Sequence, residues 1–230
     1  MQKKTISQRL ERVAAFVPDG AKLLDVGSDH AYLPIYLVQQ GRIEKALAGE
    51  VVEGPFQSAQ KNVAEHGLTK QIEVRLANGL AAFEAEDQID TIVIAGMGGR
   101  LIAQILADGH TDGQRYQRLI LQPNIDIDVV RTWLMGNDYQ LEDETVVEDD
   151  GHFYEVLIAV PGHADYSETE LKFGPFNLEK RPEAWQTKWQ REYDRVKTIM
   201  AKLESANKQD SDAHREYQQQ VTEISEALGL

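Results

Sequence analysis

The sequence predicts an α/β protein in which a mostly parallel sheet carries helices on both faces and is followed by a pair of long helices. Three observations predict this fold. Strand-like and helix-like segments alternate through residue 135, two β-rich runs follow them, and beyond residue 162 apolar residues recur every three or four positions. The first pattern is typical of repeated β-α units, which build parallel sheets with right-handed crossovers.

The alternating part contains strands and helices in turn. Apolar runs predict strands over residues 21–26, 45–49, 72–76, 89–95 and 119–122. Helical spacing of apolar residues predicts helices over residues 7–17, 31–40, 55–66, 100–107 and 126–135. Capping residues support these ends, because Ser7 can cap the first helix and Gly41 and Gly67 can close the next two in the left-handed conformation.

The rest of the chain breaks this alternation. The β-rich runs at 139–147 and 153–160 are joined by an acidic turn, which predicts an antiparallel hairpin at the end of the sheet. After a loop that contains Phe173-Gly174-Pro175-Phe176, two apolar stripes predict long helices that pack as an antiparallel, coiled-coil-like hairpin. The stripes consist of Trp185, Trp189, Tyr193, Val196, Met200 and Leu203, and of Tyr217, Val221, Ile224 and Leu228. We expect two domains, residues 1–162 and residues 163–230.

Composition limits the classes of function. The 230 residues include no cysteine, which excludes a disulfide framework, a thiolate metal site and a cysteine nucleophile, and the six scattered histidines give metal binding little support. No run of about 18 apolar residues occurs, so we expect no membrane span and a cytoplasmic location. The net charge of −14 argues against a generally basic nucleic-acid surface. Residues 180–202 nevertheless contain seven bases and three acids, which fits either a polyanion-binding surface or a solvated helix face.

A polar loop after the first predicted strand is the leading candidate site. The strand delivers Asp25, and the loop continues with Gly27, Ser28, Asp29, His30 and Tyr32. The dinucleotide fingerprint G-x-G-x-x-G is incomplete here, no G-K-[ST] motif follows, and Asp29 stands where a pyrophosphate would approach. The loop therefore favours a ligand that tolerates negative charge, and the sulfonium and ammonium groups of S-adenosylmethionine meet that demand.

Further candidates end the neighbouring strands. They are Glu50 after the second strand, Asn78 and Gly79 after the third, Gly96, Met97 and Gly98 after the fourth, and Gln122 and Asn124 after the fifth. Glu50 can accept both ribose hydroxyls of a nucleoside, Asn78 can bond an adenine edge, and the glycines allow backbone to approach a ligand closely. The carboxyl ends of parallel strands share one edge of a sheet, which is where open α/β sheets bind ligands.

Each candidate also has a structural interpretation. An acid at a strand end often caps a helix, Asn-Gly is a common turn, and a glycine-rich segment can mark a tight strand-to-helix turn. A lone histidine such as His30 is more often a structural hydrogen-bonding residue, and Tyr32 can simply pack. The aromatic residues Trp185, Trp189 and Tyr193 are better explained as the seam of the helical hairpin than as a platform for stacking bases, because their spacing continues into aliphatic residues.

Four motifs are distinctive when they are taken together. They are L-D-V-G-S-D-H-A-Y-L-P at residues 24–34, A-G-M-G-G at 95–99, L-Q-P-N at 121–124 and E-L-K-F-G-P at 170–175. Together they resemble the bacterial tRNA adenine-N1 methyltransferases that modify adenine 22, and the resemblance spans nearly the whole chain. It implies a Rossmann-like, seven-stranded class I methyltransferase domain, S-adenosylmethionine as methyl donor, tRNA as substrate and a coiled-coil-like extension. Asn78 departs from the pattern, because related methyltransferases often carry aspartate there.

The resemblance also implies roles for the candidate residues. The expected cofactor-binding residues are Asp25, Gly27, Ser28, His30, Tyr32, Glu50, Asn78, Gly79, Gly96 and Gly98. We expect Asp29 to stabilise the charge that develops on the methylated adenine or to hold its amine, and Met97 to shape the base pocket. The expected tRNA-binding residues are Gln122, Asn124, Arg191, Arg195 and Lys197. Two other classes stay open, a methyltransferase that acts on a small molecule or a protein, and a non-catalytic nucleotide-binding protein.

Overall fold

The computed structural model describes residues 6–109 and 116–230, which divide into two compact units. The first unit is Met1–Asp165 and the second is Tyr166–Leu230. We propose that the domain boundary lies after residue 162, in the segment that leads from the last strand to the first helix of the second unit.

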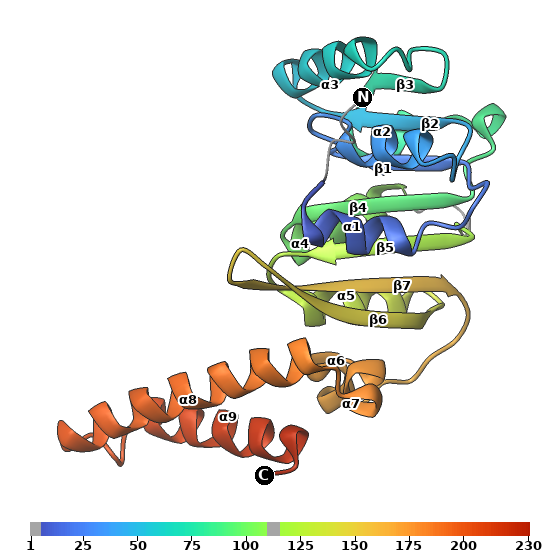
Figure 1. Cartoon of the computed structure of the whole chain (residues 1–230). Coiled ribbons are helices and arrows are strands. Elements are labelled where there is room, and N and C mark those ends of the chain that lie inside the picture. Colours follow the sequence, from blue (N-terminus) through green and yellow to red (C-terminus); the bar gives the residue numbers. More distant parts are fainter. Residues whose placement is uncertain (1–5, 110–115) are drawn as a thin grey trace. The chain divides into compact units, whose positions relative to one another are not determined.

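The first unit contains a seven-stranded sheet in the order β3-β2-β1-β4-β5-β7-β6 (Figure 1). Its strands are β1 (Leu23–Val26), β2 (Ala46–Glu50), β3 (Ile72–Leu76), β4 (Thr91–Met97), β5 (Arg118–Pro123), β6 (Tyr139–Asp149) and β7 (His152–Pro161). Strands β1 to β5 run parallel, and β7 pairs antiparallel with both β5 and β6. The mixed sheet with a terminal antiparallel hairpin is the predicted one.

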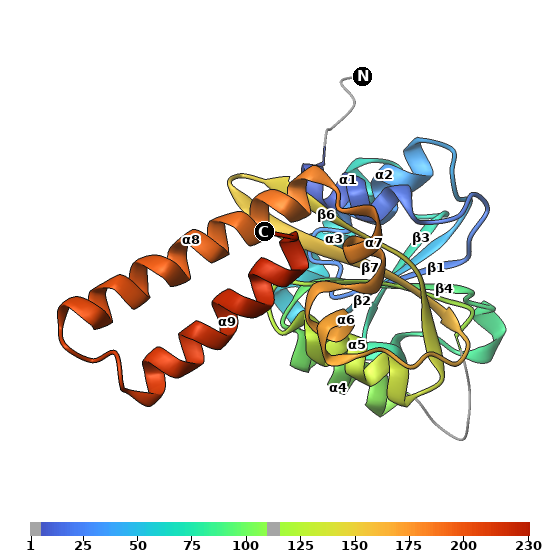
Figure 2. The same ribbon diagram turned by 90° about the horizontal axis from the view of Figure 1, so that it is seen from below.

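Helices cover both faces of this sheet. They are α1 (Gln8–Ala15), α2 (Tyr32–Gln39), α3 (Glu53–Glu65), α4 (Gly99–Gly109) and α5 (Ile127–Gly136), with short 3₁₀ helices at Gly79–Ala82 and Ala85–Asp87. Ser7 caps α1 as predicted, because its side chain accepts the backbone N–H of Leu10. Figure 2 shows α1 and α2 on one face and α4 and α5 on the other. Apolar residues of α1 and α2 pack there against central strands, for example Val13 and Leu37 with Val93.

A buried ion triad joins α5 to the antiparallel edge of the sheet. Arg131 on α5 donates hydrogen bonds to the carboxylates of Glu144 on β6 and Glu155 on β7. All three side chains are almost completely buried. Breaking such a cluster by removing one partner leaves an uncompensated charge in the interior, which typically costs several kcal/mol.

The second unit is helical throughout most of its length. It contains α6 (Glu168–Phe173), α7 (Pro175–Lys180), α8 (Glu183–Ser205) and α9 (Asp212–Leu228). The predicted stripe of α8 is largely buried, with Trp185 fully buried and its indole N–H donating to the carbonyl of Phe173. Helices α8 and α9 pack against each other as an antiparallel hairpin (Figure 2).

The loop predicted around Phe173 is wrong, because two short helices occupy that segment. Ser167 and Glu170 form a capping box that starts α6, and Pro175 occupies the first turn of α7. Within the described residues, no helix has both the length and the apolar character that crossing a membrane requires.

Candidate active site

The predicted residues of the first unit gather at the carboxyl edge of the sheet. Strand β1 pairs with both β2 and β4. Strands β2 and β3 lie on one side of β1 and strands β4 and β5 on the other, so the strand order reverses at β1. A crevice forms at such a switch point in open α/β sheets, because the loops after the two neighbouring strands leave in opposite directions. The loop after β1 and the turn after β4 therefore lie beside each other.

Asp25 is the buried carboxylate at the end of β1. The hydroxyl of Ser28 donates a hydrogen bond to it, and both side chains are buried. Burial raises the pKa of Asp25 to about 7, and the nearby charge of Glu50 adds to that rise against the opposing effect of Ser28. A buried acid that is this easily protonated is well suited to a ligand that brings positive charge.

Glu50 holds the loop from the neighbouring strand. Its carboxylate accepts the backbone N–H of Asp29, and burial raises its pKa, although that hydrogen bond offsets part of the rise. The backbone carbonyl of Glu50 accepts the N–H of Ala77 at 2.7 Å, which brings the end of β3 to the same place. The ends of β1, β2 and β3 thus form one connected rim.

The loop has an unusual backbone. Asp29 and Ala31 both adopt the left-handed region, with φ values of 53° and 55°. Non-glycine residues rarely adopt this region, and aspartate tolerates it better than alanine does. Strain of this kind often accompanies a functional loop, and here it turns the Asp29 side chain outward, where it is 70% exposed. The imidazole of His30 lies 3.7 Å from that carboxylate and 5.1 Å from the ring of Tyr32.

Gly27 and Met97 bring the two central motifs into contact. A Cβ atom on Gly27 would lie 2.2 Å from the Cε of Met97, and the φ of Gly27 is +67°. The left-handed backbone favours glycine at this position, and a larger residue would also displace the end of the Met97 side chain. The methionine side chain lies against the polar loop, so the A-G-M-G-G turn and the loop after β1 meet at the carboxyl edge of the sheet.

A β-bulge interrupts the regular pairing near the end of β4. Strands β4 and β5 pair in register up to Ala95 and Gln122, after which the register shifts so that Met97 pairs with Pro123. The residue in between is Gly96, with φ at +79°. The sequence-based prediction ended this strand at Ala95, two residues before its observed end at Met97.

The side chains of Gln122 and Asn124 form hydrogen bonds with residues of this bulge. The Gln122 side-chain oxygen accepts the N–H of Gly96 at 3.1 Å, and its nitrogen donates to the side-chain oxygen of Asn124 at 3.0 Å. Asn124 donates in turn to the carbonyl of Gly96 at 2.8 Å, and its backbone N–H donates to the carbonyl of Met97. Gln122 is fully buried, whereas Asn124 is exposed at the rim of the crevice.

The remaining predicted residues follow β3 and β4 or lie in the other unit. Asn78 is exposed after β3, and a Cβ on Gly79 would lie 3.1 Å from Ile105, so Gly79 faces α4. Gly98 lies beside the side chain of Ile125. Arg191, Arg195 and Lys197 are exposed on α8 in the second unit.

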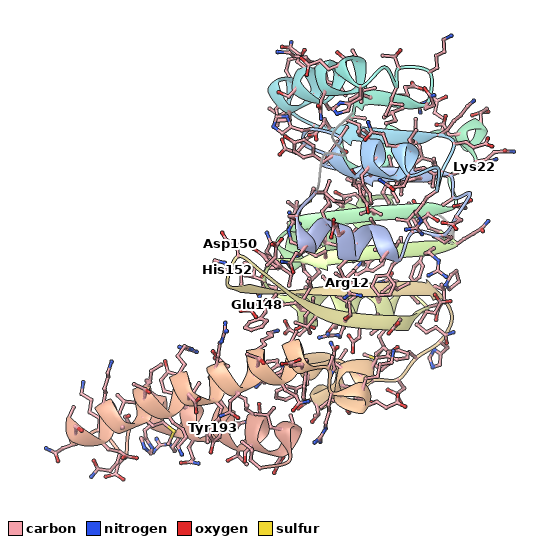
Figure 3. All side chains as sticks on the ribbon, viewed as in Figure 1. Arg12, Lys22, Glu148, Asp150, His152 and Tyr193 are labelled. Atoms are coloured by element: carbon pink, nitrogen blue, oxygen red, sulfur yellow. The ribbon has the colours of Figure 1, made fainter. Side chains whose placement is uncertain are left out.

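Two of the predicted tRNA-binding cations on α8, Arg195 and Lys197, differ in their surroundings. Arg195 forms two hydrogen bonds with the Glu192 carboxylate, at 2.6 Å and 2.7 Å. The ammonium of Lys197 lies 5.2 Å from the ring centre of Tyr193. The side chain of Tyr193 can be followed on α8 in Figure 3.

Arg9 on α1 is a residue of this region that sequence reasoning missed. Its guanidinium donates to the side-chain oxygen of Gln122, although 113 positions separate the two residues in the chain. In the sequence it is one base of an amphipathic helix, and no local signal distinguishes it from Arg12, which is exposed on the same helix.

A surface hollow lies elsewhere on the first unit. Residues at the amino ends of β1, β2 and β3 line it, including Lys22, Lys45 and Glu73. Figure 3 shows Lys22 at one end of the strands. The β6–β7 tip, which carries Glu148, Asp150 and His152, lies at the other end. No predicted site residue lines the hollow, and within residues 6–109 and 116–230 no group of histidine and acidic side chains is placed to hold a metal ion.

Comparisons with known proteins agree with this geometry. A family model described as tRNA (adenine(22)-N(1))-methyltransferase matches residues 23–226. A curated Bacillus subtilis protein named tRNA (adenine(22)-N(1))-methyltransferase is 40% identical over 212 residues, which are 90% of this chain and 89% of the relative.

Solved structures show the same likeness. A Streptococcus pneumoniae protein whose crystal structure contains S-adenosyl-L-methionine is 48% identical, with a TM-score of 0.87 over 97% of this chain and all of the other. An M. capricolum protein in complex with S-adenosyl-homocysteine is 27% identical, with a TM-score of 0.83 over 98% of this chain and 99% of the other.

Proposed function

Because the chain belongs to the tRNA (adenine(22)-N(1))-methyltransferase family, it is an S-adenosylmethionine-dependent enzyme that methylates N1 of adenine 22 in tRNA, and we propose that the crevice between β1 and β4 is its active site. The observation that carries this assignment is the convergence of Asp25, the Asp29–Glu50 hydrogen bond and Met97 at one switch point. We propose a cytoplasmic location, where tRNA is available.

The residues of β1 and β2 fit the cofactor. Two buried carboxylates, Asp25 and Glu50, have pKa values raised by burial, and a cationic ligand relieves that cost. Glu50 uses one oxygen to hold Asp29, so its other oxygen is the candidate partner for ribose hydroxyls. When bound, the cofactor supplies a methyl group on a positively charged sulfur. The other proposed contacts to it are Gly27, Ser28, His30, Tyr32, Asn78, Gly79, Gly96 and Gly98.

The reaction needs alignment more than it needs a base. Adenine N1 already carries an in-plane lone pair, which attacks the methyl carbon while the bond from carbon to sulfur breaks. Holding the two partners in line can supply several kcal/mol of the barrier. The adenine becomes cationic as it reacts, and the exposed carboxylate of Asp29 is placed to stabilise that charge or to accept a hydrogen bond from the exocyclic amine. Met97 forms the wall against which the base is held.

The two amides at the end of β5 have different roles. Asn124 is exposed and keeps its place as a proposed substrate contact. Gln122 was expected to contact tRNA as well, but it is fully buried and its amide bonds to other protein groups. We therefore assign to Gln122 the positioning of Gly96 and Asn124. The cations Arg191, Arg195 and Lys197 on α8 stay proposed contacts to tRNA phosphates.

A direct assay tests the function. The purified protein is incubated with unmodified tRNA and S-adenosylmethionine carrying a tritiated methyl group, and the product nucleosides are mapped by mass. Methylation at N1 of adenine 22 is the expected result. Label on free adenosine, a small molecule or a protein instead of tRNA would contradict it, and a mock preparation from cells that do not express the protein serves as the control for contaminating activity.

A further inference from the structure

Arg9 reaches from α1 to the substrate side of the crevice. Its guanidinium donates to the side-chain oxygen of Gln122, would lie 3.4 Å from a Cβ on Gly96, and has its central carbon 5.5 Å from the ring centre of Tyr154. The Arg9 backbone N–H donates to Asp149 at 3.0 Å, which ties the start of α1 to the β6–β7 tip. The guanidinium is therefore held from several sides, beside Gly96 and Gln122.

The partners of the Gln122 amide admit only one orientation of that group. Its oxygen faces two donors, the guanidinium of Arg9 and the N–H of Gly96. Its nitrogen faces two acceptors, the carbonyl of Pro123 and the side-chain oxygen of Asn124, both at 3.0 Å. Rotating the amide by half a turn would set donor against donor and acceptor against acceptor at all four contacts. The amide has almost the same shape either way, so these contacts alone decide its orientation.

We propose that Arg9 is a positioning residue for the methyl transfer, because it acts with the N–H of Gly96 to fix the orientation of Gln122, and through Gln122 that of Asn124. An arginine side chain only donates hydrogen bonds, so the oxygen of Gln122 must face it and the nitrogen of Gln122 must face Asn124. Asn124 then turns its oxygen toward Gln122 and its nitrogen toward the carbonyl of Gly96. We call this chain of contacts the amide relay.

The amide relay fixes which hydrogen-bonding groups meet the substrate. The bonds to Gln122 and Gly96 use one lone pair and one N–H of Asn124, whose amide can supply a second of each at the exposed rim of the crevice. Adenine offers a donor, its exocyclic amine, beside the acceptor N7, and asparagine amides commonly bind this pair. Contact at that edge leaves N1 free to attack the methyl group. This inference rests on the proposed function, because it assumes an adenine as the methyl acceptor.

Variants of three residues distinguish an effect of the amide relay on catalysis from a general loss of protein stability. Arg9→Met removes the donor, Arg9→Lys keeps a group that only donates, and Gln122→Glu keeps the acceptor for Arg9 but replaces the donor that faces Asn124. Arg12→Met is the matched control, because it removes the same charge from an exposed position of the same helix (Figure 3). Steady-state methylation of unmodified tRNA is measured together with the KM for S-adenosylmethionine.

The relay predicts a loss in kcat with little change in cofactor KM. Arg9→Met and Gln122→Glu should each lower kcat about tenfold to 100-fold, as small misalignments of reacting groups do, whereas Arg9→Lys should recover most of the activity. The double variant should be no slower than the slower single variant, because both changes break one unit. Wild-type kcat in Arg9→Met, additive losses in the double variant, or an equal loss in Arg12→Met would overturn the proposal.

A second measurement does not depend on activity. The side-chain amide signals of Gln122 and Asn124 in nitrogen-15 NMR spectra should shift in Arg9→Met and stay in place in Arg12→Met. Unchanged Asn124 signals in Arg9→Met would refute the relay even if kcat falls. If the wild-type protein methylates no tRNA while the Asn124 signals do shift, the relay stands and the proposed function fails. If Arg9→Met does not fold, Arg9→Lys and Gln122→Glu decide the same question.

Discussion

The carboxylate of Glu50 accepts the backbone N–H of Asp29, so the last residue of β2 holds the loop that follows β1. One acidic side chain therefore serves both the shape of the loop and the proposed binding of the cofactor ribose. Two residues that are 21 positions apart in the chain become one structural unit at the edge of the sheet.

Glu50→Gln should weaken cofactor binding. The substitution keeps an oxygen for Asp29 but removes the charge and one acceptor for ribose hydroxyls, and losing a charged hydrogen bond typically costs about 1.5–3 kcal/mol, or roughly 10- to 100-fold in affinity. Isothermal titration with S-adenosylmethionine measures the change. Glu53→Gln is the matched control, because Glu53 is exposed at the start of α3 and its carboxylate accepts a hydrogen bond from Gln57 in the next turn. Wild-type affinity in Glu50→Gln would remove Glu50 from the cofactor site.

Asp29→Asn should slow turnover while leaving most of the cofactor affinity. Asparagine tolerates the left-handed backbone at this position, so the variant removes the charge with little added strain. Loss of a group that stabilises developing charge commonly lowers kcat by about 100-fold or more. Single-turnover methylation and cofactor titration give the two quantities. Asp150→Asn makes the same change at another left-handed aspartate, on the β6–β7 tip, and should be silent. Full activity in Asp29→Asn would show that the carboxylate takes no part in the reaction.

Asp25→Asn should stabilise the cofactor-free protein increasingly as pH rises. The folded-state pKa of Asp25 is about 7 against an ordinary value of 3.8, so between these values the folded chain holds a proton that the unfolded chain has released. Asp25 therefore lowers the stability of the wild type as pH rises toward 7, and the variant lacks this contribution. From pH 5 to pH 8 the difference in unfolding free energy between variant and wild type should grow by about 3 kcal/mol. Urea unfolding at both pH values measures it, and a difference independent of pH would contradict the prediction.

Removing the charges of Arg191, Arg195 and Lys197 together should weaken tRNA binding and flatten its salt dependence. Each phosphate contact contributes a slope of about 0.7–0.9 in a plot of log affinity against log salt, so the triple variant should lower the slope by roughly 2 to 3. Glu192→Gln should act in the opposite direction, because it releases Arg195 from its ion pair. Filter binding across a salt series tests both. An unchanged slope in the triple variant would indicate that α8 does not contact tRNA, and cofactor affinity should be unaffected in every case.

The sequence was sufficient to predict the strands and the edge of the sheet that carries the site. Apolar runs and glycine punctuation are local signals, and the parallel arrangement follows from the alternation of strands and helices. The loop between the two units was predicted wrongly because α6 and α7 have six residues each, too few to show helical periodicity. Their capping box and first-turn proline are the only local signals that could have revealed them.

The side-chain hydrogen bonds around the proposed site could not be predicted in the same way. The sequence placed Gln122 at the end of the fifth strand as a substrate contact, but only the three-dimensional structure shows that its amide is enclosed by four protein partners. The hydrogen bond from Arg9 depends on how α1 packs on the sheet. Contacts between residues so distant in sequence leave no pattern in a single chain.

The ion triad of Arg131, Glu144 and Glu155 has a consequence for the order in which the antiparallel edge assembles during folding. The charges of the triad balance only when α5, β6 and β7 are all in place, and a buried ion cluster that lacks one member typically costs several kcal/mol. Helix α5 and strands β6 and β7 are therefore expected to join the parallel core in one cooperative step. Strand β7 flanks β5, so the end of β5 with Gln122 and Asn124 is expected to gain its final shape only when that step is complete.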